Sequence, residues 1–123
     1  MKKKLQLAVG KYYRNRAGEI IHITDKTDAH PHPFIAHGHG YFTEDGRFLP
    51  DEETPLDLAY EVTDPILKFF TYPRMDLLSI SAIEAAAGMP SRTLYKFVKG
   101  TRGLPKKHRA PLIEILKTLG YDG

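Results

Sequence analysis

The sequence predicts an α+β fold: a small antiparallel β-sheet or barrel-like part in residues 1–62, then a helical domain of four or five helices in residues 63–123. Three observations lead to this prediction. The first half has short alternating apolar stretches separated by Gly and Pro turns, a pattern typical of half-buried strands. The second half has apolar residues at helical spacing, bounded by capping residues and glycines. The charge divides at the same place, with a net charge of −2 over residues 1–62 and +5 over residues 73–123.

Four or five short strands are expected in residues 1–62. The stretch KYYRNRAGEIIHIT has two β-rich runs around Ala17-Gly18, which suits the turn of a hairpin. Asp45-Gly46, within GYFTEDGRFL, predicts a second hairpin with a type I′ turn, because both central residues of that turn have positive φ and this pair tolerates it. From Leu56 to Val62 every second residue is large and apolar, which predicts a strand with one buried face.

The first two helices of the second half are marked by residues that favour helix ends. The stretch PILKFF follows Thr63 and Asp64, either of which can cap it, and has a proline in its first turn. The stretch SISAIEAAAGM has Ser79 or Ser81 as its cap and Gly88 as its stop.

Two further helices follow. The stretch PSRTLYKFVKG has Pro90 near its start and Gly100 as its stop. The stretch PKKHRAPLIEILKTLG is opened by Pro105 and closed by Gly120. Because a proline inside a helix removes a hydrogen bond, Pro111 predicts a kink or a division into two helices there.

The second and third of these helices, with Gly88 between them, form a helix-turn-helix pattern, and the small residues at 85–87 permit a close crossing. The face of the third helix that is predicted to be buried consists of Leu94, Phe97 and Val98. The opposite face is basic and consists of Arg92, Lys96 and Lys99, flanked by Ser91 and Tyr95. A helix used only for packing would usually mix acids into its outer face.

Basic residues accumulate around this pattern. No acid occurs between Glu84 and Glu114. The basic residues in that interval are Arg92, Lys96, Lys99, Arg102, Lys106, Lys107 and Arg109. A local basic field of this kind attracts polyanions, above all nucleic acid, although a solvated basic face is the simpler alternative.

These residues resemble the phage-repressor family of helix-turn-helix DNA-binding proteins, the Cro and lambda-repressor type. The resemblance covers about residues 67–121 and rests on SISAIEAAAGMPSRTLYKFVKGTRGLPKKH, especially the turn at Gly88, the Leu94 and Phe97 pair, and Gly100 before a basic loop. It implies a recognition helix at about residues 90–99 that enters the major groove, and binding as a dimer to paired half-sites. The chain departs from the family in its short first helix and in Pro73, which breaks the stretch before the motif.

The resemblance also implies roles for individual residues. The residues expected to read base edges are Ser91, Arg92 and Tyr95. The residues expected to contact the DNA backbone or groove are Ser81, Thr93, Lys96, Lys99, Arg102, Lys106 and Lys107. The chemistry agrees, because an arginine can donate two hydrogen bonds to guanine O6 and N7, whereas lysines bind phosphates without reading sequence.

The leading interpretation is therefore a sequence-specific double-stranded DNA-binding protein, a repressor-like transcriptional regulator of phage or prophage type. The alternative is a protein-interaction module that keeps the helical scaffold and binds a protein partner through residues 1–62. The spacing PFIAHGHGYFTEDGRF…PLDL in that half loosely resembles a small β-domain of phage and prophage proteins, which brings no activity with it. A homodimer, without a cofactor and located in the cytoplasm at the nucleoid, is expected under the first interpretation.

Four of the six histidines lie in HPHPFIAHGHG, and His30, His32, His37 and His39 are weak candidates for a metal site. His37 and His39 would share one side of a strand, with His30 and His32 opposite them. The simpler interpretation is the middle of a polar hairpin. We expect no enzyme, because the chain has no cysteine, nucleophile elbow or phosphate-binding Gly loop. Its apolar runs are also too short for a membrane span.

Overall fold

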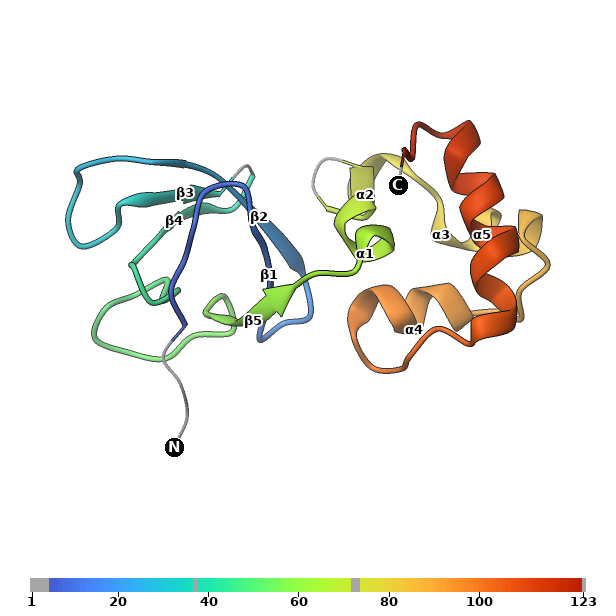
Figure 1. Ribbon diagram of the computed structural model, residues 1–123. Coiled ribbons are helices and arrows are strands. Elements are labelled where there is room, and N and C mark those ends of the chain that lie inside the picture. Colours follow the sequence, from blue (N-terminus) through green and yellow to red (C-terminus); the bar gives the residue numbers. More distant parts are fainter. Residues whose placement is uncertain (1–4, 37, 72–73, 123) are drawn as a thin grey trace.

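The computed structural model describes residues 5–36, 38–71 and 74–122 (Figure 1). Within these ranges the protein has the expected α+β class, with a five-stranded sheet followed by five helices. The strands are β1 (Tyr12–Asn15), β2 (Ile20–Lys26), β3 (Phe34–Ala36), β4 (Gly40–Phe42) and β5 (Leu58–Val62). The helices are α1 (Pro65–Phe69), α2 (Arg74–Leu77), α3 (Ile80–Ala86), α4 (Thr93–Lys99) and α5 (Lys106–Thr118).

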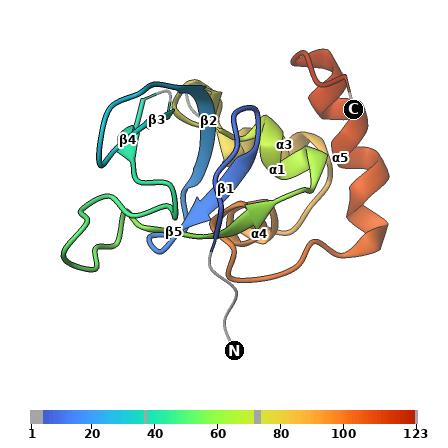
Figure 2. The ribbon, with the colours of Figure 1, turned by 60° about the vertical axis from the view of Figure 1, so that its left-hand side comes forward.

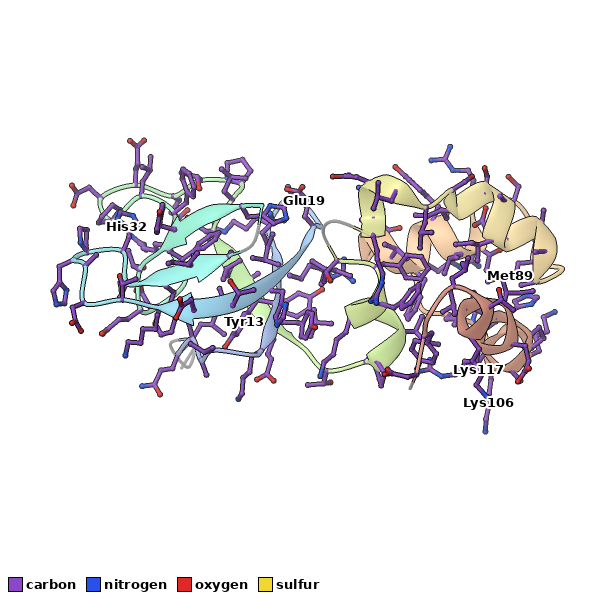
Figure 3. All side chains as sticks on the ribbon, turned by 90° about the horizontal axis from the view of Figure 1, so that it is seen from above. Tyr13, Glu19, His32, Met89, Lys106 and Lys117 are labelled. Carbon is purple, nitrogen blue, oxygen red and sulfur yellow. The ribbon has the colours of Figure 1, made fainter. Side chains whose placement is uncertain are left out.

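The sheet is antiparallel throughout, with the strand order β4-β3-β2-β1-β5, and it curls into a half-barrel (Figure 2). The hairpin predicted at Ala17-Gly18 joins β1 to β2, and Gly18 takes a φ of 89° there. Such a left-handed conformation has little cost for glycine because it lacks a Cβ. The concave side encloses a first core that includes Tyr13, Ile21 and Phe42 (Tyr13 is labelled in Figure 3).

The turn at Asp45-Gly46 forms, but the type I′ prediction was wrong. Arg92 is the single non-glycine residue with positive φ in the described ranges, so only Gly46 of the pair is left-handed. The Thr43 hydroxyl donates to Asp45 Oδ1 at 2.6 Å, and the main-chain nitrogen of Gly46 donates to Thr43 O at 3.0 Å. These hydrogen bonds close the turn locally, and the chain after it does not continue as a strand.

The alternation predicted from Leu56 to Val62 holds only in part. Leu56 lies before β5 and is exposed, and Tyr60 is 52% exposed. The register of β5 against β1 shifts between Arg14, which pairs with Tyr60, and Asn15, which pairs with Leu58. This bulge adds one residue on β5, so it reverses the face that the following residues present. Leu58 therefore joins the core inside the sheet, whereas Val62 joins a second core on the opposite side.

The helical half begins as its capping residues predict. Thr63 or Asp64 was predicted to cap the start of α1, and Asp64 does so by accepting from Ile66 N at 3.0 Å. Ser79 or Ser81 was predicted to cap the start of α3, and Ser79 does so by accepting from Ala82 N at 3.2 Å. Helix α5 runs through Pro111 without division, so the chain is not split into two helices there. The fifth helix is instead α2, a short turn of helix just before α3. The break expected at Pro73 lies outside the described residues.

The second core connects the sheet with the helices. Ile20 and Val62, on the convex side of the sheet, belong to it. Its helical members are Ile66, Phe69, Ile83, Leu94, Val98, Leu112 and Leu116. Figure 1 shows the sheet and the helices side by side, joined by the chain from β5 to α1. Because strand and helix side chains share this core, burial of apolar surface fixes the helical half against the sheet.

Candidate nucleic-acid interface

The α3–α4 unit carries most of the predicted site, and it differs from the prediction in one respect. The proposed recognition helix was expected at about residues 90–99, but α4 begins at Thr93. Residues 87–92 form the connection, in which Gly88 has a φ of 70°. Pro90 and Ser91 therefore precede the helix. Of the three residues predicted for the apolar face, Leu94 and Val98 are buried, and Phe97 is partly buried and packs against the same core.

Glu84 explains why α4 starts where it does. This α3 side chain is only 4% exposed, and its carboxylate accepts hydrogen bonds from three main-chain nitrogens at the start of α4. The distances are 3.1 Å from Arg92 N, 2.7 Å from Leu94 N and 3.0 Å from Tyr95 N. The N-cap residue Arg92 makes no side-chain cap of its own. A carboxylate from the neighbouring helix thus satisfies the free N–H groups that every helix start leaves.

Arg92 has an unusual backbone, with a φ of 69°. A left-handed conformation is costly for a residue with a Cβ and persists only where its surroundings impose it. Here the bond from Arg92 N to Glu84 fixes the main chain, and the side chain extends over the ring of Tyr95, with Cζ 5.0 Å from the ring centroid. Lys99 Nζ lies 5.9 Å from the same centroid. The structure thus brings Arg92, Tyr95 and Lys99 together.

The other predicted contact residues lie on the same half but are more dispersed. Ser91, Arg92, Tyr95 and Lys96 are exposed, whereas Thr93 and Lys99 are half-buried. Ser81, in the first turn of α3, is exposed and lies 3.2 Å from the Ser79 hydroxyl. Arg102, Lys106 and Lys107 are exposed in the α4–α5 connection and the start of α5. Figure 3 shows Lys106 on the outer side of the helical half, away from the sheet.

Ion pairing reduces the basic surface only at its edge. Arg109 Nη2 lies 2.8 Å from Asp64 Oδ1. The pKa of the Arg109 guanidinium is raised, because the hydrogen bond to Asp64 and the charge of its carboxylate outweigh the opposite effect of burial. Lys117 Nζ lies 3.6 Å from Glu114 Oε1. In residues 5–36, 38–71 and 74–122 no ion pair involves Arg92, Lys96, Lys99, Arg102, Lys106 or Lys107. Their charges are therefore available to an external anion.

The sheet holds the other end of α4. Arg14, in β1, is 5% exposed and donates from Nη1 to Val98 O at 2.6 Å and to Gly18 O at 2.8 Å. A Cβ on Gly18 would lie 2.8 Å from Lys99 O, and one on Gly100 would lie 2.9 Å from Arg14 Cζ. Only glycine permits these approaches. Figure 2 shows α4 beside the end of the sheet formed by β1 and β5. Helix α4 is thus fixed at its start by Glu84 and at its end by Arg14.

Sequence reasoning missed Arg14 and Glu84. The available signal for Glu84 was a single acid inside an otherwise apolar and alanine-rich helix, followed by a long stretch of basic residues. Arg14 had no comparable signal, because its partner Val98 is far away in the sequence.

The histidine-rich stretch has a different arrangement from the one considered for metal binding. His39 lies in the turn before β4 and not on a strand, and His32 Nε2 lies 2.6 Å from Phe48 O. His30 is exposed in the loop before β3, and His37 lies outside the described residues. Across the described ranges, no group of three or more His, Asp or Glu side chains is placed to hold a metal ion.

Comparisons with models of known protein families, with curated proteins and with solved structures found no match to this chain. Of the helices described, none is long and apolar enough to cross a membrane.

Proposed function

We propose that the protein binds double-stranded DNA sequence-specifically, with α3–α4 acting as a helix-turn-helix unit, and serves as a repressor-like transcriptional regulator of phage or prophage type. The observation that carries this proposal is the exposed surface formed by Arg92, Tyr95 and Lys96. The segment that contains these residues, 85–113, has no Asp or Glu. The residues proposed to read base edges are Ser91, Arg92 and Tyr95. A homodimer at the nucleoid, bound to paired half-sites, is part of the proposal.

The geometry of Arg92 supports base reading. Its main chain is tied to Glu84 and its guanidinium lies over the Tyr95 ring, so the side chain starts from a restricted set of conformations. An arginine that is already ordered loses less entropy when it binds. Because Arg92 and Ser91 precede α4, they would approach the bases from the helix start, the end of a recognition helix that contacts base edges. The guanidinium would then face guanine O6 and N7.

Phosphate contacts are proposed for the surrounding residues, which are Ser81, Thr93, Lys96, Lys99, Arg102, Lys106 and Lys107. These charges set the register of the protein on the duplex without reading its sequence. If about four to six phosphates are neutralised, the logarithm of the binding constant should fall with the logarithm of salt concentration at a slope of roughly −4 to −5.

Selection from random duplex DNA, followed by gel shift of the selected sequence, tests this function. We expect binding at about 50 mM salt with a clear preference over scrambled DNA. The double variant Arg92→Glu with Lys96→Glu should abolish binding. The matched control is Lys11→Glu with Lys26→Glu, which makes the same change of charge on exposed residues of the sheet half. The proposal fails if the wild-type protein does not bind, shows no preference, or is weakened equally by the control.

Exposed aromatic side chains favour a second candidate, a protein-interaction module that binds through the sheet. Tyr41 on β4 is 57% exposed and Tyr60 on β5 is 52% exposed, and these two strands are the edges of the sheet. Edge strands with exposed aromatic residues are common sites for protein partners. Under this second function, the variant Arg92→Glu with Lys96→Glu would leave partner binding intact, whereas Tyr41→Ser with Tyr60→Ser would abolish it.

A further inference from the structure

Arg92 and Tyr95 are both held at their main chain by one carboxylate. Glu84 Oε1 accepts from Arg92 N at 3.1 Å, and Glu84 Oε2 accepts from Tyr95 N at 3.0 Å. Because Glu84 is buried, solvent competes little for these hydrogen bonds. The main-chain positions from which the two side chains project are therefore set before any ligand binds.

The Arg92 guanidinium lies over the Tyr95 ring and keeps its hydrogen-bond donors free. Its Cζ is 5.0 Å from the ring centroid. Within residues 5–36, 38–71 and 74–122, no hydrogen bond or ion pair engages this guanidinium. A cation–π contact is made with the face of the ring, and it uses none of the N–H groups, which lie in the plane of the guanidinium. These donors therefore remain available to the edge of a base.

Tyr95 is best suited to contact a ligand through the edge of its ring. Two cations lie over this ring, the Arg92 guanidinium and Lys99 Nζ, which is 5.9 Å from the centroid. A base that stacked on the ring would have to displace one of them, whereas contact with the ring edge leaves both in place. The side chain is 38% exposed. Apart from the hydroxyl, the edge consists of C–H groups, which suit a methyl group, and the major groove presents one on C5 of thymine.

We propose that Arg92 and Tyr95 together read two adjacent base pairs, one with guanine and the next with thymine. The Arg92 guanidinium would donate to guanine O6 and N7, and the Tyr95 ring edge would contact the thymine C5 methyl. The spacing agrees, because successive bases rise by about 3.4 Å along a strand, and a separation of 5.0 Å spans one such step with a lateral offset. This inference rests on the proposed DNA binding and deepens it by naming the base step.

Selection from random duplex DNA with the full chain gives the first test. We expect the selected half-site to contain a G·C pair beside an A·T pair. Replacing the thymine of that A·T pair by deoxyuridine removes only the methyl group, and gel shift should show about fourfold weaker binding. Deoxyuridine at a thymine outside the selected site is the control and should leave the affinity unchanged. A selected site without this step, or equal affinity for the thymine and uracil duplexes, would overturn the inference.

Two variants at position 95 test whether the ring makes the methyl contact. Tyr95→Phe keeps the ring edge and should keep the preference for thymine over uracil, even where its overall affinity falls. Tyr95→Ser removes the ring and should remove the preference. Both are measured at about 50 mM salt, where phosphate contacts keep a weakened variant bound. Each comparison uses two duplexes with one protein preparation, so partial unfolding of a variant cancels. A preference lost in Tyr95→Phe, or kept in Tyr95→Ser, would disprove the assignment.

DNA binding and the reading of this base step fail on different results. If the wild-type protein binds no duplex, the proposed function is wrong and the reading of the step is wrong with it. If the protein binds a selected sequence specifically but does not distinguish thymine from uracil in the step, DNA binding stands and only the role given to Tyr95 is overturned.

Discussion

The side chain of Arg14 donates a hydrogen bond of 2.6 Å to the main-chain oxygen of Val98, which joins the first strand of the sheet to the last turn of α4. The same nitrogen donates to Gly18 O at 2.8 Å. Gly18 and Gly100 allow the two segments to approach this closely. The sheet is thus more than a neighbour of the helical half, because it positions the end of the helix that is central to the proposed function.

Replacing Arg14 should therefore destabilise the whole chain. Arg14→Met keeps much of the apolar stem but leaves Val98 O without its donor, and we expect a loss of about 2–3 kcal/mol in the free energy of unfolding. Urea denaturation followed by circular dichroism measures this loss. The control is Arg16→Met, which removes an exposed ion pair to Glu53 and should cost clearly less, because a solvent-exposed ion pair contributes little to stability. Equal effects of the two variants would show that the Arg14–Val98 bond does not matter for stability.

The start of α4 should depend on Glu84 in the same way. Glu84→Ala leaves three main-chain N–H groups without their acceptor, so we expect a loss of about 2–4 kcal/mol in the free energy of unfolding. Glu84→Gln should cost less than Glu84→Ala, because its amide oxygen can still accept hydrogen bonds. It should still destabilise the fold, because its NH2 group faces main-chain N–H donors. Urea denaturation measures both variants. Glu114→Ala, at an exposed acid of α5, is the control and should change stability by less than about 0.5 kcal/mol. A neutral Glu84→Ala variant would contradict this role.

Local signals in the sequence predicted the elements that depend on neighbouring residues. The hairpin at Ala17-Gly18, the cap at Asp64 and the cap at Ser79 all follow from residues within a few positions of the feature. The bulge between β1 and β5 could not be predicted in this way. It depends on the pairing of Arg14 and Asn15 with a strand that lies far along the chain.

The candidate site shows the same division between local and distant causes. The basic character of residues 92–107 is visible in the sequence, but the left-handed backbone of Arg92 is not, because a local pattern would assign that conformation to glycine. It arises from the contact with Glu84, a residue of another helix. The start of α4 was therefore predicted too early.

Asp57 should make stability depend on pH. Its burial raises the pKa of the carboxyl group, but hydrogen bonds from Phe48 N, Thr54 N and Thr54 Oγ1 outweigh burial, so the net pKa is lowered. A lowered folded-state pKa means that the carboxylate stabilises the fold above the pKa of an unfolded aspartate. This contribution is lost as the pH falls through the folded-state value.

The variant Asp57→Asn tests this dependence. At neutral pH it should lower the free energy of unfolding by about 1–3 kcal/mol, because the charged acceptor is lost. The difference between wild type and variant should shrink as the pH falls below the ordinary pKa of aspartate. Urea denaturation at a series of pH values measures it, with Asp51→Asn, an exposed acid in the same loop, as the control. A difference that stays constant down to strongly acidic pH would rule out the lowered pKa.

Arg92 offers a way to separate stability from the proposed DNA binding. Its φ of 69° is unfavourable for any residue with a Cβ but not for glycine. Arg92→Gly should therefore be more stable than Arg92→Ala, by about 1 kcal/mol. Lys96, inside α4, should show the opposite order, because glycine within a helix costs about 1 kcal/mol relative to alanine. Urea denaturation of the four variants gives both differences, and the same order at both positions would contradict the left-handed conformation of Arg92. Gel shift should find DNA binding lost in both Arg92 variants, since neither carries the guanidinium, although the two variants differ in stability.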